Sequence, residues 1–237
     1  IVMYNKSISK IDIVQNIAKE LPVPPVMSYF LCDCWYVSEK IINTFAIKGF
    51  HTIGALKTNR MLYPYGIKQK LSEFAALLSV THSDFHLVTV KNQKYYVYRY
   101  EGKLNGIENA VVLLSYPEKA FGKPKALRAF LSTDVSLSTD EILSYYVCRW
   151  PIEVFFRQCK DKLALDSYQI RSAQGIRRYW LIMSLAHYMC VIGNGKSSSF
   201  EDGYHQISDI IQLEKYRYIF QCAKASNDFD TFMKVAV

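Results

Sequence analysis

Two apolar runs with a helix between them constrain the fold of this chain more than any other feature. Met27–Cys32 is typical of a strand that is buried on both faces, and His51–Lys57 has the pattern of a second strand. Between them, Ser38–Ala46 has the pattern of a helix that ends near Gly49. Because a strand–helix–strand order favours parallel pairing within one sheet, we predict an α/β core.

A further helix is predicted ahead of this core, over Ser9–Leu21. Ser9 can cap its first turn, and Asp12 stands at the third helical position, where an acidic side chain completes a capping box. The pattern therefore assigns Asp12 to a helix end rather than to a catalytic site.

The chain changes character after residue 60. Short β-patterned runs separated by turns continue to Leu131, and two of them, Phe85–Val90 and Tyr95–Tyr100, are predicted to form a hairpin. This organisation indicates a mostly antiparallel β insertion with one helical piece, Gln69–Leu78.

Helical periodicity returns after residue 131. Ser138 and Glu141 form a capping box, Pro151 interrupts the helix that follows, and a later helix covers Ala173–Ile192. The polar stretch 194–203 indicates a linker before a helical tail. We divide the chain into a partial core (1–60), a β-rich insertion (61–131), a helical part that completes the core (132–192), and a linker with a helical tail (193–237).

Composition limits the class of protein that the chain can be and the kind of partner that it suits. Half of the residues are hydrophobic, which is enough to bury a core, and Lys and Arg exceed Asp and Glu by 29 to 21, for a net charge of +8. This surplus suits a polyanionic partner, although many unrelated soluble proteins share it. The six cysteines have no paired zinc spacing and no secretory signal opens the chain, so we expect a cytoplasmic protein.

The segment 145–160 holds the side chains best suited to chemistry. Tyr146, Arg149, Glu153 and Lys160 follow the spacing Y-(2)-R-(3)-E-(6)-K, and steps of four and seven place Glu153, Arg157 and Lys160 on one helix face. The alternative interpretation is an exposed helix face that carries ordinary solvated ion pairs.

Two carboxylates in this pattern could serve phosphoryl-transfer chemistry. Asp33 follows the first core strand, where open α/β sheets place their sites, and carboxylates such as Asp33 and Glu153 are hard ligands for Mg²⁺. Arg149 and Lys160 could hold DNA phosphates, and Tyr146 could bind a phosphate or stack on a base. Phosphate contact is an equally weighted alternative to a structural role for Lys57 and Arg60, which follow the second core strand.

These residues resemble a known family. Asp33-Cys-Trp-Tyr36 is similar to the second-aspartate motif of bacterial insertion-sequence DDE transposases, and the spacing of Tyr146, Arg149, Glu153 and Lys160 resembles the Y-R-E-K motif of the insertion-sequence-four-like group. The similarity covers Ser9 to about Leu185. It implies an RNase H-like fold with a β-rich insertion.

The resemblance also implies an activity and partners. It implies metal-dependent DNA cleavage and strand transfer at insertion-sequence ends, with Mg²⁺ or Mn²⁺ held by Asp33 and Glu153. Phosphate contacts would come from Tyr146, Arg149 and Lys160. The expected partners are element-end and target DNA and further copies of the chain, in a nucleoid-associated protein, with no membrane and no small-molecule substrate.

One part of the family pattern is not found. The family has a third acidic residue, an aspartate, on its first core strand, and Asp12 is the only aspartate before Asp33. We therefore expect the chain to lack the first core strands and to be inactive as it stands. Two rival hypotheses follow, a non-catalytic DNA-binding remnant that could inhibit a full-length relative, and an RNase H-like metal nuclease of another lineage.

Overall fold

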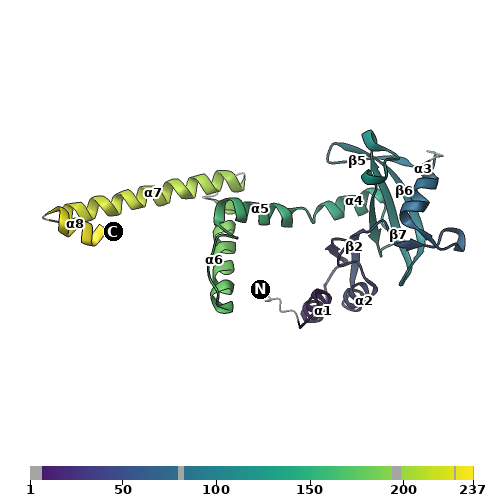
Figure 1. The fold of residues 1–237 in the computed structure, drawn as a ribbon, viewed down its shortest axis with the longest axis horizontal. Coiled ribbons are helices and arrows are strands. Elements are labelled where there is room, and N and C mark those ends of the chain that lie inside the picture. Colours follow the sequence, from purple (N-terminus) through teal and green to yellow (C-terminus); the bar gives the residue numbers. More distant parts are fainter. Residues whose placement is uncertain (1–6, 80–82, 194–198, 227, 237) are drawn as a thin grey trace. The chain divides into compact units, whose positions relative to one another are not determined.

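The computed structural model describes residues 7–79, 83–193, 199–226 and 228–236. The chain forms two compact units, with the boundary between Glu153 and Val154. The first unit holds a β-sheet with helices on its faces, and the second is helical (Figure 1). The mixed α/β architecture predicted from the sequence is confirmed.

One sheet organises the first unit. Among the described residues it has eight strands, in the order β1-β2-β8-β7-β6-β3-β4, with β5 paired to β6. β1 and β2 are parallel, as predicted, and the remaining pairs are antiparallel. The strands are β1 (Ser28–Cys32), β2 (Phe50–Leu56), β3 (Met61–Leu62), β4 (Gln69–Lys70), β5 (His86–Val90), β6 (Gln93–Leu104), β7 (Ile107–Pro117) and β8 (Arg128–Ser132).

Helices cover both faces of this sheet. The helices of the first unit are α1 (Lys10–Glu20), α2 (Glu39–Ile47), α3 (Leu71–Ser79) and α4 (Thr139–Val147), with short 3-10 turns at Pro64–Gly66, Glu118–Ala120 and Pro124–Ala126. Side chains of α2 and α3 share one core cluster with the sheet, and side chains of α4 share a second. α1 packs on α2 in a third cluster and thus lies outside the sheet layer.

β7 shows why the sheet needs both layers. Its residues alternate between the two clusters: Val112 and Leu114 pack with α2 and α3, whereas Val111 and Leu113 pack with α4. All four are fully buried. A strand with apolar residues on both faces is stable only between two covering layers.

β1 differs from its prediction as a strand buried on both faces. It is an edge strand in the described sheet, and only Cys32 of its residues is buried. The apolar composition of a strand does not encode which strands flank it, so an edge strand and a central strand can have the same sequence pattern. The β5–β6 hairpin is confirmed, but its turn is tighter than predicted because Lys91 and Asn92 both adopt left-handed φ angles, of 46° and 63°.

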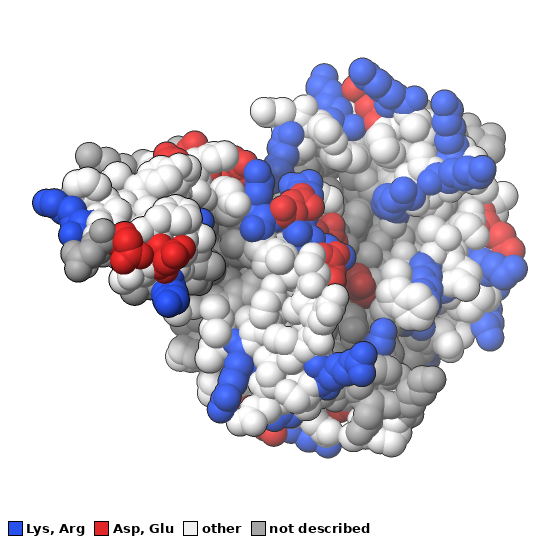
Figure 2. Space-filling model, turned by 60° about the vertical axis from the view of Figure 1, so that its left-hand side comes forward, with Lys and Arg blue, Asp and Glu red and all other residues white. Residues whose placement is uncertain are grey.

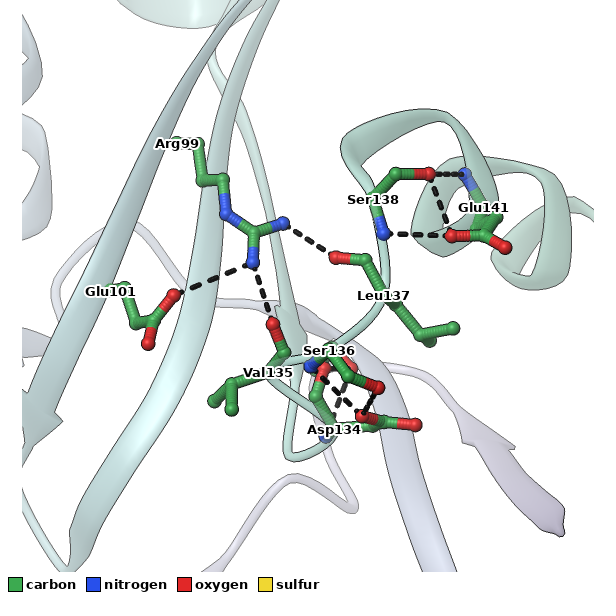
Figure 3. A network of polar contacts seen from close by, with 9 residues as sticks. Arg99, Glu101, Asp134, Val135, Ser136, Leu137, Ser138 and Glu141 are labelled. Atoms are coloured by element: carbon green, nitrogen blue, oxygen red, sulfur yellow. Dashed lines mark hydrogen bonds and ion pairs between the residues drawn. The ribbon is translucent and has the colours of Figure 1, made fainter.

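A polar network fixes the start of α4 (Figure 3). Arg99 of β6 donates hydrogen bonds to the backbone oxygens of Leu137 at 2.7 Å and Val135 at 2.9 Å. Ser138 and Glu141 form the predicted capping box. The loop from β8 to α4 is thereby held to the long hairpin of β6 and β7.

Asp134 stabilises the same loop through hydrogen bonds of its carboxylate. Its Oδ1 accepts hydrogen bonds from the backbone and hydroxyl of Ser136, and its Oδ2 accepts one from the Tyr29 hydroxyl at 2.8 Å. These hydrogen bonds outweigh the opposing effect of burial and lower the pKa of Asp134. Burial and the Asp134 contact raise the pKa of Tyr29 to about 12.

The second unit consists of helices. It contains α5 (Pro151–Leu163) from Val154 onward, α6 (Ala173–Ile192), α7 (Phe200–Ala225) and α8 (Phe229–Ala236). α6 and α7 approach closely at Gly203, where a Cβ atom would lie 1.8 Å from the backbone oxygen of Cys190. His187 of α6 lies between the rings of Phe155 and Phe200 and contacts Gln158 at 2.9 Å.

The linker predicted over 194–203 is shorter than expected. Ser199 caps α7 by accepting a hydrogen bond from the backbone of Asp202, so Phe200–Gly203 belong to the helix. Residues 194–198 lie outside the described part of the chain. The boundaries chosen for the other segments remain predictions.

Candidate active site

Asp33 stands at the carboxyl edge of the sheet, directly after β1. Because β1 and β2 are parallel and in register from Ser28 to Cys32, Asp33 and the residues that follow β2 emerge at the same edge. The Trp35 backbone N–H donates to Asp33 Oδ1 at 2.8 Å, which fixes the carboxylate in a tight turn. Asp33 also lines a cavity of about 430 Å³ with Lys10, Ile11, Trp35 and Tyr36.

Close packing holds this turn against β2. A Cβ atom on Gly54 would lie 2.5 Å from Cγ2 of Val37 and 2.9 Å from Sγ of Cys32, so only glycine fits. Burial, reinforced by the charge of Asp33, raises the pKa of Cys32 to about 12. The thiol therefore stays protonated at neutral pH.

Arg149 and Glu153 form an ion pair beside the sheet. Arg149 lies in the connection between α4 and α5, and its Nη2 contacts Glu153 Oε1 from one helical turn away. Its guanidinium lies over the ring of Tyr146, 5.5 Å from the centroid, and that ring packs on Phe130. Burial lowers the pKa of Arg149, but the contacts with Glu153 and Tyr146 outweigh this effect, so the pKa of Arg149 is raised.

The two carboxylates share an electrostatic neighbourhood through Tyr146 and Arg149. Burial raises the pKa of Tyr146, the charge of Arg149 opposes this shift, and the charges of Cys32 and Asp33 add to it. The Asp33 end of β1 and the Arg149 end of α4 therefore lie near each other within the first unit. The Glu153 side chain is 42% exposed and that of Arg149 only 19%, so the acid is the accessible partner.

The family model of the transposase DDE domain matches residues 1–189. The chain belongs to this family. DDE transposases are nucleases of transposition that act on DNA and generally use divalent metal ions. No curated protein matches the chain. No helix in the described part of the DDE domain or its helical tail is long and apolar enough to cross a membrane.

Potential metal ligands do not cluster in the described part of this DDE domain. Within the ranges that the structure covers, no three His, Cys, Asp or Glu side chains gather closely enough to hold an ion. Asp12 cannot supply the third acid, because its carboxylate accepts hydrogen bonds from the backbone and hydroxyl of Ser9 in the predicted capping box. The donor chemistry of Asp33 and Glu153 nevertheless suits Mg²⁺, which is bound by one or two carboxylates together with waters and substrate phosphates.

The other basic residues predicted for the site differ in their surroundings. Arg157 and Lys160 are exposed on α5 and belong to the second unit. Lys57 is exposed, and its ammonium group lies 4.0 Å from the centre of the Trp35 ring. Arg60 donates a hydrogen bond to the backbone oxygen of Val37, so part of its guanidinium fixes the turn after β2.

Three aromatic residues near these groups were missed by sequence reasoning. Trp150 and Tyr95 line a largely apolar cavity of about 530 Å³ together with Tyr146 and Arg149. Trp35 is 71% exposed beside Asp33. The sequence signal was present for two of them, because Trp35 lies inside the second-aspartate motif and Trp150 follows Arg149 directly.

Proposed function

We propose that this domain catalyses DNA strand cleavage and strand transfer at the ends of an insertion sequence, as a transposase of the insertion-sequence-four-like group with an RNase H-like core. The observation that carries the proposal is the Arg149–Glu153 pair on the Asp33 side of the sheet, in a chain whose family is the transposase DDE domain. A solvated surface pair would not need the burial that Arg149 undergoes.

Asp33 and Glu153 are the proposed ligands of Mg²⁺ or Mn²⁺. Oδ1 of Asp33 is held by the Trp35 backbone, which orients the carboxylate toward solvent-accessible space, and the Glu153 carboxylate is accessible at 42% exposure. A divalent metal at such a site supplies an activated water or 3′-hydroxyl and stabilises the leaving oxygen. The protein itself contributes the position of the two acids.

Arg149 has two proposed tasks. Its ion pair keeps Glu153 oriented in the absence of DNA, and its guanidinium offers further N–H groups to a phosphate. Lys160, Arg157, Lys57 and Arg60 are proposed further phosphate contacts, and Tyr146 supports the DNA near the cut.

Substitution of Glu153 tests the proposal. The protein translated from the whole reading frame is incubated with supercoiled plasmid and with element-end duplexes, in Mg²⁺ and then in Mn²⁺. Glu153→Gln preserves the shape but removes the charge of the ligand, so we expect cleavage to be abolished while DNA binding persists. Glu108→Gln is the control, because Glu108 is 89% exposed and pairs with Lys103 away from the site. Cleavage by Glu153→Gln near the wild-type rate would contradict the assignment.

A second candidate function has its own support. Asp33 and Glu153 are proposed for only two of the family's three acids, and no three potential metal ligands gather in the described part of the chain; both points support a DNA-binding protein without catalysis. This alternative predicts salt-sensitive binding to DNA and no nicking in either metal ion. It could then inhibit an active relative by forming mixed complexes.

A further inference from the structure

A chain of side-chain contacts joins the sheet to the Arg149–Glu153 pair, within the first unit. It begins at Phe130 of β8, whose ring centroid lies 4.7 Å from that of Tyr146. The Arg149 guanidinium lies over the Tyr146 ring, 5.5 Å from its centroid, and forms the ion pair with Glu153. This contact chain, Phe130–Tyr146–Arg149–Glu153, therefore starts in a strand of the sheet and ends at a proposed metal ligand.

The strand that carries Phe130 is a fixed support. β8 is paired on both sides, and Phe130 is the partner of Ala55 in β2 and of Leu113 in β7. Its neighbours along the strand, Ala129 and Leu131, are buried. Because the register of a strand with a buried face is strongly specified, the Phe130 ring has a defined position at the start of the contact chain.

The connection between α4 and α5 is fixed in its backbone but not in its side chains. The Arg149 N–H donates to the backbone oxygen of Tyr146 at 3.1 Å, and the Glu153 N–H donates to that of Trp150 at 3.0 Å. Pro151, which has a restricted φ, begins α5. These features set where the Arg149 side chain leaves the backbone, but a long arginine side chain has many rotamers in water. The orientation of the ion pair therefore depends on what the guanidinium packs against.

Phe130 lies at the border between the core and a cavity. It packs against the cluster that α4 shares with the sheet, and it lines the apolar cavity of about 530 Å³ that Tyr146 and Arg149 also border. The buried members described for that cluster are all aliphatic, so an aromatic ring is placed where the cluster meets Tyr146. Contacts between two aromatic rings have preferred geometries, which aliphatic side chains do not impose.

We propose that Phe130 is a positioning residue of the candidate active site: through the Tyr146 ring it fixes the Arg149 guanidinium, and it thereby orients the Glu153 carboxylate. In this role Phe130 touches neither metal nor DNA. A carboxylate that is held in place before the metal binds needs less reorganisation when it becomes a ligand. The inference rests on the proposed function for the task of Glu153, but the positioning exists in the free protein and can be measured there.

The first measurement reads the Arg149 guanidinium by nuclear magnetic resonance, without metal or DNA. Rotation about the Nε–Cζ bond is slow when a guanidinium is held, so its two Nη groups give separate signals; those of Arg149 are assigned by their loss in Arg149→Lys. We expect separate signals in wild type and in Phe130→Tyr, which keeps the ring, and one averaged signal in Phe130→Leu. Phe130→Met is a second variant without the ring, for the case that Phe130→Leu does not fold. Phe121→Leu is the matched control, because Phe121 is also half-buried and its ring packs on Phe85 and Tyr96.

The second measurement connects Phe130 to the metal requirement. The protein and the DNA substrates are those of the Glu153 test, and the Mg²⁺ concentration that gives half-maximal cleavage is recorded. We expect Phe130→Leu to raise this concentration by roughly 10- to 100-fold, as when a group that orients a metal ligand is removed, and Phe130→Tyr to restore most of the loss. DNA affinity should stay within about two-fold of wild type, because the Lys and Arg side chains spread over much of the face drawn in Figure 2 supply its sequence-independent part.

A pair of double variants separates positioning from core packing. If Phe130 acts through Tyr146, then Phe130→Leu should change the Mg²⁺ requirement by less than about two-fold once Tyr146→Leu is present. Full additivity of the two substitutions would assign Phe130 to core packing and overturn the positioning role.

The outcomes separate this inference from the proposed function. An averaged Arg149 signal in wild type, or separate signals retained in a variant without the Phe130 ring, would overturn the positioning role alone. Equal effects of Phe121→Leu and Phe130→Leu would overturn it as well. Absence of cleavage by the wild-type protein would overturn the proposed function, whereas the Arg149 signals would still decide whether Phe130 fixes the guanidinium.

Discussion

Arg99→Ala should destabilise the first unit through the loop that leads into α4. The Arg99 guanidinium donates to the backbone oxygens of Leu137 at 2.7 Å and Val135 at 2.9 Å, and the substitution removes both hydrogen bonds. Hydrogen bonds from a charged donor contribute about 1.5–3 kcal/mol each. The side chain is 28% exposed and water can reach part of the site, so we take the lower value for each bond and expect a loss of about 3 kcal/mol.

The assay is urea denaturation in a Trp180→Phe background, where the remaining tryptophans, Trp35 and Trp150, both report on the first unit. Arg99→Lys keeps the charge but cannot reach both oxygens with a planar fork, so it should fall between wild type and Arg99→Ala. Glu101→Gln is the control for the 3.5 Å ion pair with Arg99, an exposed contact worth about 0–1 kcal/mol.

A result within about 0.5 kcal/mol of wild type for Arg99→Ala would refute this reasoning, since it lies in the range of ordinary surface substitutions. A loss reproduced in full by Glu101→Gln would also refute it, because the ion pair would then carry the stability in place of the two backbone contacts.

Two further predictions concern pH. Burial raises the pKa of Asp134, but hydrogen bonds from Ser136 and Tyr29 outweigh this effect and lower it. The stability that these hydrogen bonds contribute is therefore present above the ordinary pKa of 3.8 and is lost as the pH falls through the lowered value. Asp134→Asn should flatten the dependence of the free energy of unfolding on pH, measured by urea titration below about pH 4. Burial lowers the pKa of His187, so the unfolded chain binds a proton more readily than the folded chain. The second unit should therefore lose stability as the pH falls below 6.5. His187→Phe should remove this pH dependence between about pH 7.5 and 5.5, and an unchanged dependence would assign it to another group.

Features encoded over a few residues could be predicted from the sequence. The capping boxes at Ser9 and Ser138 depend on a partner three residues away, and both helices begin where these boxes place them. The ion pair between Arg149 and Glu153 was not predicted in this way, because Pro151 interrupts the helical pattern between them and Arg149 lies in the connection before α5.

Features that depend on distant neighbours could not be predicted. The contact between Trp35 and Lys57 joins residues 22 positions apart, and it exists because parallel pairing aligns the ends of β1 and β2. β3 and β4 have only two residues each, and their conformation follows from the strands beside them. No local pattern states whether β1 has a neighbour on its outer side.

Metal-directed cleavage of the polypeptide chain tests the central claim most directly. Fe²⁺ occupies hard-ligand Mg²⁺ sites, and with ascorbate and peroxide it produces radicals that cut the backbone next to its ligands. The account predicts two cuts in one reaction, near Asp33 and near Glu153, suppressed by excess Mg²⁺ and both lost in Asp33→Asn. Cuts at only one of these positions, or a cut near Glu153 that persists in Asp33→Asn, would contradict a metal site shared by the two carboxylates.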